Sequence, residues 1–116
     1  MPILSSAQLC SGSLGDPVLN ITFGTGHGKL AASVTGFAYA GGCPGKSQYT
    51  LSNLIFGCGE DKTWLMLAGD HTRDLNGSFM LVNAQSDDGA ITPAIVYRDT
   101  VRNLCNNINY VFSAWV

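Results

Sequence analysis

The sequence predicts an all-β domain, most simply a β-sandwich of two packed sheets. Short runs rich in β-branched and aromatic residues recur along the chain, and clusters of Gly, Asn, Asp or Pro separate them. No segment keeps an apolar stripe of helical period for three turns. The length of 116 residues suits a single domain. The expected strands are 18–23, 30–39, 48–56, 63–67, 78–84, 91–97 and 109–116.

Alternation of side chains supports two of these strands most clearly. In QYTLSNLIF, one face is expected to carry Tyr49, Leu51, Asn53 and Ile55, because residues two apart in a strand point the same way. The final NINYVFSAWV alternates in the same manner and places Trp115 in the expected core. Only 100–105 has the composition of a helical turn.

Composition and charge exclude several classes of protein. Charged residues make up 12% of the chain against 46% apolar residues, with a formal net charge of −2, so we expect neither disorder nor a nucleic-acid partner. No apolar run approaches the roughly 20 residues that span a bilayer, so we expect no membrane insertion. Residues 1–7 are similar to the end of a secretory signal peptide, and 8–116 form the expected domain. A frayed cytosolic N-terminus is the open alternative.

The four cysteines favour an exported protein. An even number in a short chain is typical of disulfides formed in an oxidising compartment, and three pairings are possible. We predict the pairs Cys43–Cys58 and Cys10–Cys105. A zinc site is disfavoured because no CxxC occurs and His27 and His71 lack metal-ligand spacing with any cysteine pair. Free buried thiols remain an alternative.

The motifs of common enzymes do not match. TFGTGHGKL lacks the first Gly and the Ser or Thr of a phosphate-binding loop, so we expect a flexible loop there. No GxSxG motif occurs, and neither histidine has a recognisable Ser or Cys partner. The carboxylates of Asp70, Asp74, Asp87 and Asp88 have no sequence spacing that fixes an acid–base pair. We therefore predict that the protein is not an enzyme.

The segment DHTRDLNG has the residue types of a calcium site. Asp70, Asp74 and Asn76 offer hard oxygen ligands, and Gly77 allows the backbone to turn. The alternative is structural, because Asp and Asn side chains also bond the backbone of their own turn and Asn-Gly favours positive φ. Calcium is the only cofactor that the sequence suggests.

Three stretches of the chain resemble a known family. CSGSLGDPVLNITFGTG at 10–26, GDHTRDLNGSFMLVNA at 69–84 and DTVRNLCNNINYVFSAWV at 99–116 are similar to the N-terminal domain of surface proteins of gliding Bacteroidetes. More distantly, DHT followed by an aromatic-Met strand is similar to MAM domains, which are related to carbohydrate-binding modules. The resemblance implies a jelly-roll domain, displayed on the cell surface after type IX secretion.

The same resemblance shapes further expectations. Arg73 stands where the family more often has Gly. The family domain continues past the AWV strand, so the chain looks like the N-terminal two-thirds of a domain that lacks its last strands. Asp16 is the remaining candidate for a calcium ligand. An open sheet edge would pair with a second copy as a strand-mediated homodimer, or be completed by a segment outside the chain.

We expect a non-enzymatic, extracellular adhesion or glycan-binding domain, with a glycan or another surface polymer as its partner. The aromatic side chains expected to stack on sugar rings are those of Tyr39, Tyr49 and Trp64. The alternative is a structural capping or spacer domain of a surface filament, which binds no ligand. A fragment of a glycoside hydrolase is the last of the three hypotheses.

Overall fold

The computed structural model describes residues 19–85 and 95–116. The chain forms two compact units, Ile21–Asp99 on one hand and Met1–Asn20 with Thr100–Val116 on the other. All of the assigned strands belong to the first unit. The only helical element among the described residues is the 3₁₀ turn Glu60–Lys62, which the sequence did not predict. The all-β prediction is therefore confirmed for the described part of the chain.

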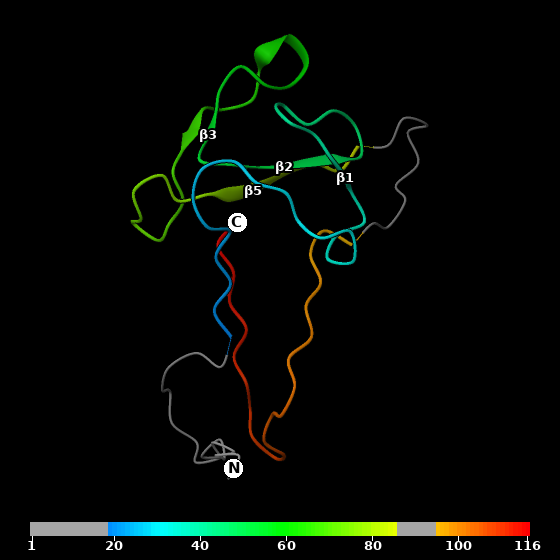
Figure 1. Cartoon of the computed structure of the whole chain (residues 1–116), viewed down its shortest axis with the longest axis vertical. Helices are drawn as coiled ribbons and strands as arrows, with labels where there is room; N and C mark the ends of the chain where they lie inside the picture. The colour runs from blue at the N-terminus through cyan, green and yellow to red at the C-terminus, as the bar shows by residue number, and fades with distance from the viewer. Residues whose placement is uncertain (1–18, 86–94) are drawn as a thin grey trace, which may run out of the picture. The chain divides into compact units, whose positions relative to one another are not determined.

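The larger sheet is built around β2 (Gln48–Ser52), which lies between β1 (Ala38–Tyr39) and β5 (Phe79–Asn83) (Figure 1). β1 and β2 run parallel, whereas β2 and β5 run antiparallel. In the antiparallel pair Tyr49 lies opposite Val82 and Leu51 lies opposite Met80. Because alternate residues share a face, this register puts four apolar side chains on the same face of the sheet.

That face forms the hydrophobic core. Tyr49 and Leu51 are buried and pack with Phe37, and partly buried apolar side chains surround them. The surrounding side chains are those of Phe23, Leu30, Met80 and Val82. The opposite face of β2 is buried as well but polar, with Thr50 and Ser52. The alternation read from QYTLSNLIF thus holds within β2.

The smaller sheet is the antiparallel pair β3 (Leu54–Ile55) and β4 (Leu67–Ala68). The predicted strand 48–56 is interrupted at Asn53, whose carbonyl accepts a hydrogen bond from Gly69 N–H (2.7 Å), and Ser52 Oγ bonds the backbone of Leu54. Several apolar side chains of this hairpin are exposed. They belong to Leu54, Phe56, Leu65, Met66 and Leu67.

The disulfide Cys43–Cys58 is present and joins residues 15 apart in the sequence, as predicted. Cys105 is also disulfide-bonded, and Cys10, the partner expected for it, lies outside the described residues. Disulfides persist in oxidising compartments, so the bond indicates a non-reducing environment for the protein. Among the described residues, no helix has the length and apolar character that crossing a bilayer requires.

The structure differs from the expected strands in several places. Residues 19–23, 95–97 and 109–116 carry no strand, and the strand expected at 30–39 is reduced to β1. A flexible loop is expected at TFGTGHGKL, whereas the structure pairs this segment with its neighbours, through bridges from Thr25 to Gly77 and from Gly28 to Leu51. Positive φ angles at Gly24 (73°) and Gly26 (75°) make that path possible.

Residues 105–110, in the second unit, form a turn that a side-chain hydrogen bond closes. Tyr110 places its hydroxyl on the backbone of Cys105, accepting from the amide N–H at 2.7 Å and donating to the carbonyl. Asn103 and Asn107 adopt positive φ near 60°. No helix forms at 100–105, and Trp115 is exposed, so its expected place in the core is wrong.

Candidate functional site

The acidic loop, residues 70–77, is shaped by its own hydrogen bonds. Asp70 Oδ1 accepts from the backbone N–H of Thr72 (2.9 Å) and from the Thr72 hydroxyl (2.6 Å). The N–H of Asp74 donates in turn to Thr72 Oγ1 at 3.2 Å. The Asp and Thr side chains therefore stabilise the turn in the way that the structural alternative predicts.

The end of the acidic loop docks on the glycine-rich loop. Asn76, at φ 63°, accepts a hydrogen bond from Gly26 N–H (3.0 Å) on its carbonyl and one from Asn53 Nδ2 (3.3 Å) on its side chain. Gly77 is buried, and an added Cβ there would contact the Asp70 carboxylate. Neighbouring Ser78 bonds Gly24 and Gly26. A glycine is required at 77 by this close approach.

The Thr72 hydroxyl lowers the pKa of Asp70, because its hydrogen bond stabilises the carboxylate. The Thr72 N–H and the charge of His71 act in the same direction, and desolvation opposes them. Asp70 is therefore ionised at neutral pH. Within 19–85 and 95–116, no group of three or more His, Cys, Asp or Glu side chains comes together to hold a metal ion. Asp16, Asp87 and Asp88 lie outside the described residues, so calcium binding stays a prediction.

The three aromatic residues expected to contact a ligand fall into two separate places. Tyr39 and Tyr49 line one pocket, which we call the tyrosine pocket. Trp64 lines another depression, which we call the tryptophan groove. The structure therefore places the three side chains at two separate depressions, and their role in ligand binding stays a prediction.

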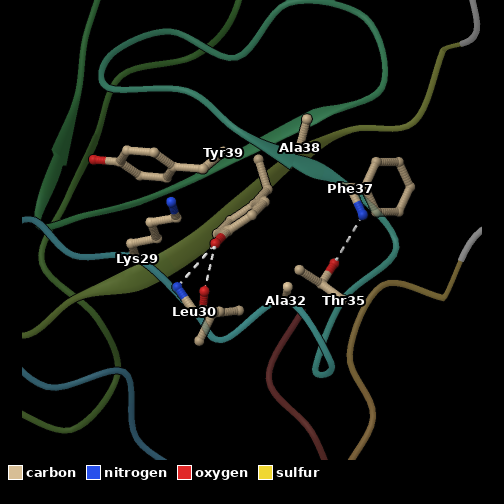
Figure 2. Close-up of a pocket in the computed structure, with 8 residues that line it drawn as sticks. Lys29, Leu30, Ala32, Thr35, Phe37, Ala38 and Tyr39 are labelled. Carbon is tan, nitrogen blue, oxygen red and sulfur yellow. Dashed lines mark hydrogen bonds between the residues drawn. The ribbon is translucent and has the colours of Figure 1, made fainter.

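The tyrosine pocket has a volume of about 270 Å³ (Figure 2). Its lining residues are Lys29, Leu30, Ala32, Thr35, Phe37, Ala38, Tyr39 and Tyr49. The Tyr49 hydroxyl is engaged, accepting from Leu30 N–H at 2.8 Å and donating to Leu30 O at 3.3 Å, so this buried side chain is part of the core. Tyr39 is exposed and meets the Tyr49 ring edge-on at 5.8 Å.

The tryptophan groove is larger, about 600 Å³. Its lining residues are Cys43, Pro44, Gly45, Lys46, Gly59, Glu60, Thr63, Trp64, Asn83 and Gln85. The disulfide ties its two walls together, because Cys43 begins one wall and Cys58 precedes the other. Asn83, at the end of β5, donates to Pro44 O (3.4 Å) and accepts from Gln85 N–H (3.2 Å).

Trp64 is held in the groove by its backbone and its ring. The backbone N–H of Trp64 donates to Cys58 O at 3.0 Å. An added Cβ at Gly59 would contact the indole, so the ring lies on the Gly59 backbone. Gly59 has φ 86°, which favours glycine there. The half-buried indole therefore has a defined orientation beside the polar groups of the groove.

Sequence reasoning missed the polar residues of the groove. Glu60, Asn83 and Gln85 come from a 3₁₀ turn and from the end of a strand, and nothing in their sequence spacing links them. The expected disulfide offered the one available indication, since joining Cys43 to Cys58 brings the segments after each cysteine together.

No family model, curated protein or solved structure matches the chain. The jelly-roll domain and the relation to surface proteins of gliding Bacteroidetes therefore stay predictions.

Proposed function

We propose that the protein is a non-enzymatic, extracellular glycan-binding domain that acts in adhesion, and that the tryptophan groove is its ligand site. The observation that carries this proposal is the composition of the groove. The indole of Trp64 shares one depression with the side-chain amides of Asn83 and Gln85 and with the carboxylate of Glu60. Sugar recognition combines these elements, since an aromatic face covers the C–H groups of a sugar ring and amides and carboxylates bond its hydroxyls.

The charges of the groove favour a neutral sugar. Among the described residues that line it, Lys46 and Glu60 are the charged ones, and they carry opposite charges. Neutral hydroxyls can pair with both signs, because a hydroxyl donates to a carboxylate and accepts from an ammonium group. We infer that hexoses without ionised groups are the preferred ligands.

The Cys43–Cys58 bond supports the extracellular part of the proposal, because such bonds persist outside reducing compartments. A jelly-roll sandwich on the surface of a gliding bacterium is the finer form of the same proposal. It rests on the three sequence stretches that resemble that family.

A structural spacer with no ligand is the second candidate function. The observation in its favour is that the Asn83 side chain already bonds Pro44 and Gln85. Asn83 then serves to close the fold around the groove, and only Gln85, Glu60 and Trp64 remain for a ligand.

A glycan array with the oxidised chain, followed by thermal melting with the best sugar, tests the proposal. A ligand that binds only the folded state must raise the melting temperature. We expect Trp64→Ala to abolish the array response and the shift, and Trp64→Phe to retain part of both. Leu65→Ala is the matched control, since Leu65 is exposed and lies outside the groove.

Array binding that survives Trp64→Ala would exclude the groove, and no binding to any glycan would favour the spacer. The same melting curves recorded with added calcium test the metal prediction for the acidic loop. If calcium binds there, the shift should disappear in Asp74→Asn.

A further inference from the structure

The tyrosine pocket differs from the groove in its charge. Among the described residues that line it, Lys29 is the only charged one, and none of them carries a carboxylate. Leu30, Phe37 and the two alanines make the rest of the wall apolar. A cation facing an apolar, partly enclosed surface favours an anionic ligand with an apolar side.

The Lys29 side chain lies beside the ring of Tyr39. Its Nζ lies 5.6 Å from the centroid of the Tyr39 ring, a cation–π geometry, and Figure 2 shows the two side chains next to each other. This contact holds the ammonium group at the pocket, so a ligand meets a cation that has already lost part of its freedom. Figure 2 also shows the bonds to Leu30 that engage the Tyr49 hydroxyl.

Arg98 is hydrogen-bonded to the chain segment that forms part of the pocket wall. Arg98 Nη2 donates to the carbonyl of Ser33 at 3.1 Å, and the backbone N–H of Arg98 donates to Val34 O at 2.7 Å. Residues 33 and 34 connect Ala32 to Thr35, which both line the pocket. Arg98 therefore ties this part of the wall to residues 95–98, and Asp99 follows it in the sequence, so Lys29 is the cation on which the site depends.

We propose that the tyrosine pocket binds a carboxylated sugar, a hexuronic acid residue. The carboxylate pairs with the Lys29 ammonium, and a C–H face of the sugar ring covers the apolar wall at Leu30 and Phe37. Tyr39 is exposed, so its hydroxyl is within reach of a ligand at the rim. This site is separate from the tryptophan groove, and its occupation does not require binding there.

A carboxylate fits this chemistry better than a phosphate does. Phosphate carries up to two charges and is held in proteins by several N–H donors or an arginine fork. The pocket offers one ammonium group, and its other lining residues are apolar or hydroxyl-bearing. A single negative charge on a largely apolar body is the matching ligand.

Titration of the isotope-labelled, oxidised full chain with sodium glucuronate, followed by amide chemical shifts in NMR, tests the proposal. For a ligand of this size we expect a dissociation constant on the order of 1 mM. Shifts should concentrate at residues 29–39 and weaken with added salt. Glucose, which lacks the carboxylate, and acetate, which lacks the ring, should each bind at least about tenfold more weakly.

Two variants separate charge from packing. Lys29→Met keeps an unbranched apolar stem against Tyr39 and removes the charge, so it should weaken glucuronate binding about tenfold or more. Lys29→Arg should stay within about threefold of the wild type. Lys62→Met is the matched control, because Lys62 is exposed and lines neither depression, and it should leave glucuronate binding unchanged.

Each remaining outcome decides against the proposal. Shifts centred on the tryptophan groove, or unchanged binding by Lys29→Met, would remove the tyrosine pocket as the site. Equal binding of acetate and glucuronate would leave a general anion site and exclude sugar recognition. Equal binding of glucose would exclude a role for the carboxylate. The glycan-array result for Trp64 variants is unaffected by any of these results.

Discussion

Gly77 is the residue at which the acidic loop and the glycine-rich loop meet. It is buried, bridges to Thr25, and lies so close to the Asp70 carboxylate that a methyl group would displace it. The turn residues of this loop thus have a structural role whether or not a metal binds. Asp70, Thr72 and Asn76 each bond a defined partner.

We expect Gly77→Ala to destabilise the fold by about 1–3 kcal/mol, the usual cost of overpacking a closely packed position. Urea denaturation measures this difference. Gly41→Ala is the control, because an added Cβ at Gly41 meets no atom within 4 Å. Equal stability of the two variants would mean that Asp70 moves aside without cost.

The lowered pKa of Asp70 makes the stability of the fold dependent on pH. The carboxylate is favoured in the folded state, so its contribution is present above the unfolded pKa, near 3.8, and is lost as the pH falls through the lower folded pKa. Thr72→Val removes the hydroxyl that contributes most to this shift.

We therefore expect the stability difference between wild type and Thr72→Val to be largest above about pH 4 and to shrink at lower pH. Denaturation midpoints measured across this range give the result. Thr63→Val is the control, since the Thr63 hydroxyl donates to the backbone carbonyl of Glu60 and the difference should not vary with pH. A difference for Thr72→Val that grows toward acid would contradict the sign of the shift.

At the scale of elements, the Cys43–Cys58 disulfide joins the loop before β2 to the turn after β3. Both segments contribute walls to the tryptophan groove, and Cys58 is buried. The bond therefore constrains the unfolded chain and also sets the geometry of the proposed site.

Replacing both cysteines, as Cys43→Ser with Cys58→Ser, should cost about 3 kcal/mol, the value expected for a closed loop of 15 residues. We expect the same variant to lose glycan binding at temperatures where it is still folded. Unfolding curves and array binding measure the two effects. Glycan binding that survives in the folded double variant would show that the groove does not depend on the bond.

At the scale of the whole molecule, the apolar surface of the β3–β4 hairpin is the main unexplained feature. Leu65 is 90% exposed and Phe56 is 75% exposed, and residues 63–69 contain neither charge nor proline. Charged residues and prolines are the common means by which proteins protect sheet edges. The strand-mediated homodimer expected from the sequence would use such an edge.

We expect the chain to self-associate with increasing concentration through this hairpin, which light scattering during gel filtration measures. Met66→Lys should shift the equilibrium toward monomer, because a lysine on the edge opposes pairing. Leu75→Lys, at an exposed position of the acidic loop, should have no such effect. A wild-type chain that stays monomeric at high concentration would contradict the prediction.

Local patterns predicted β2 and β5 well and the flanking strands poorly. The alternation around Tyr49 and Leu51 is strong because one face of β2 is apolar and the other is small and polar. Residues 19–23 and 109–116 have equal strand propensity but carry no strand in the structure. Propensity fixes a preference for extended backbone, whereas a strand also requires a partner for its N–H and C=O groups.

The sequence alone predicted an all-β chain, disulfides among its cysteines with three pairings possible, and a turn rich in Asp and Asn at residues 70–77. These features depend on neighbouring residues, or on cysteine number and compartment. Only the tertiary structure decided that Cys43 pairs with Cys58, that Trp64 and Tyr39 line different depressions, and that Lys29 is the only charged residue among the described residues lining the tyrosine pocket. Such a site is assembled from segments distant in sequence, and the register of β2 with β5 and the path of the loops set which side chains meet.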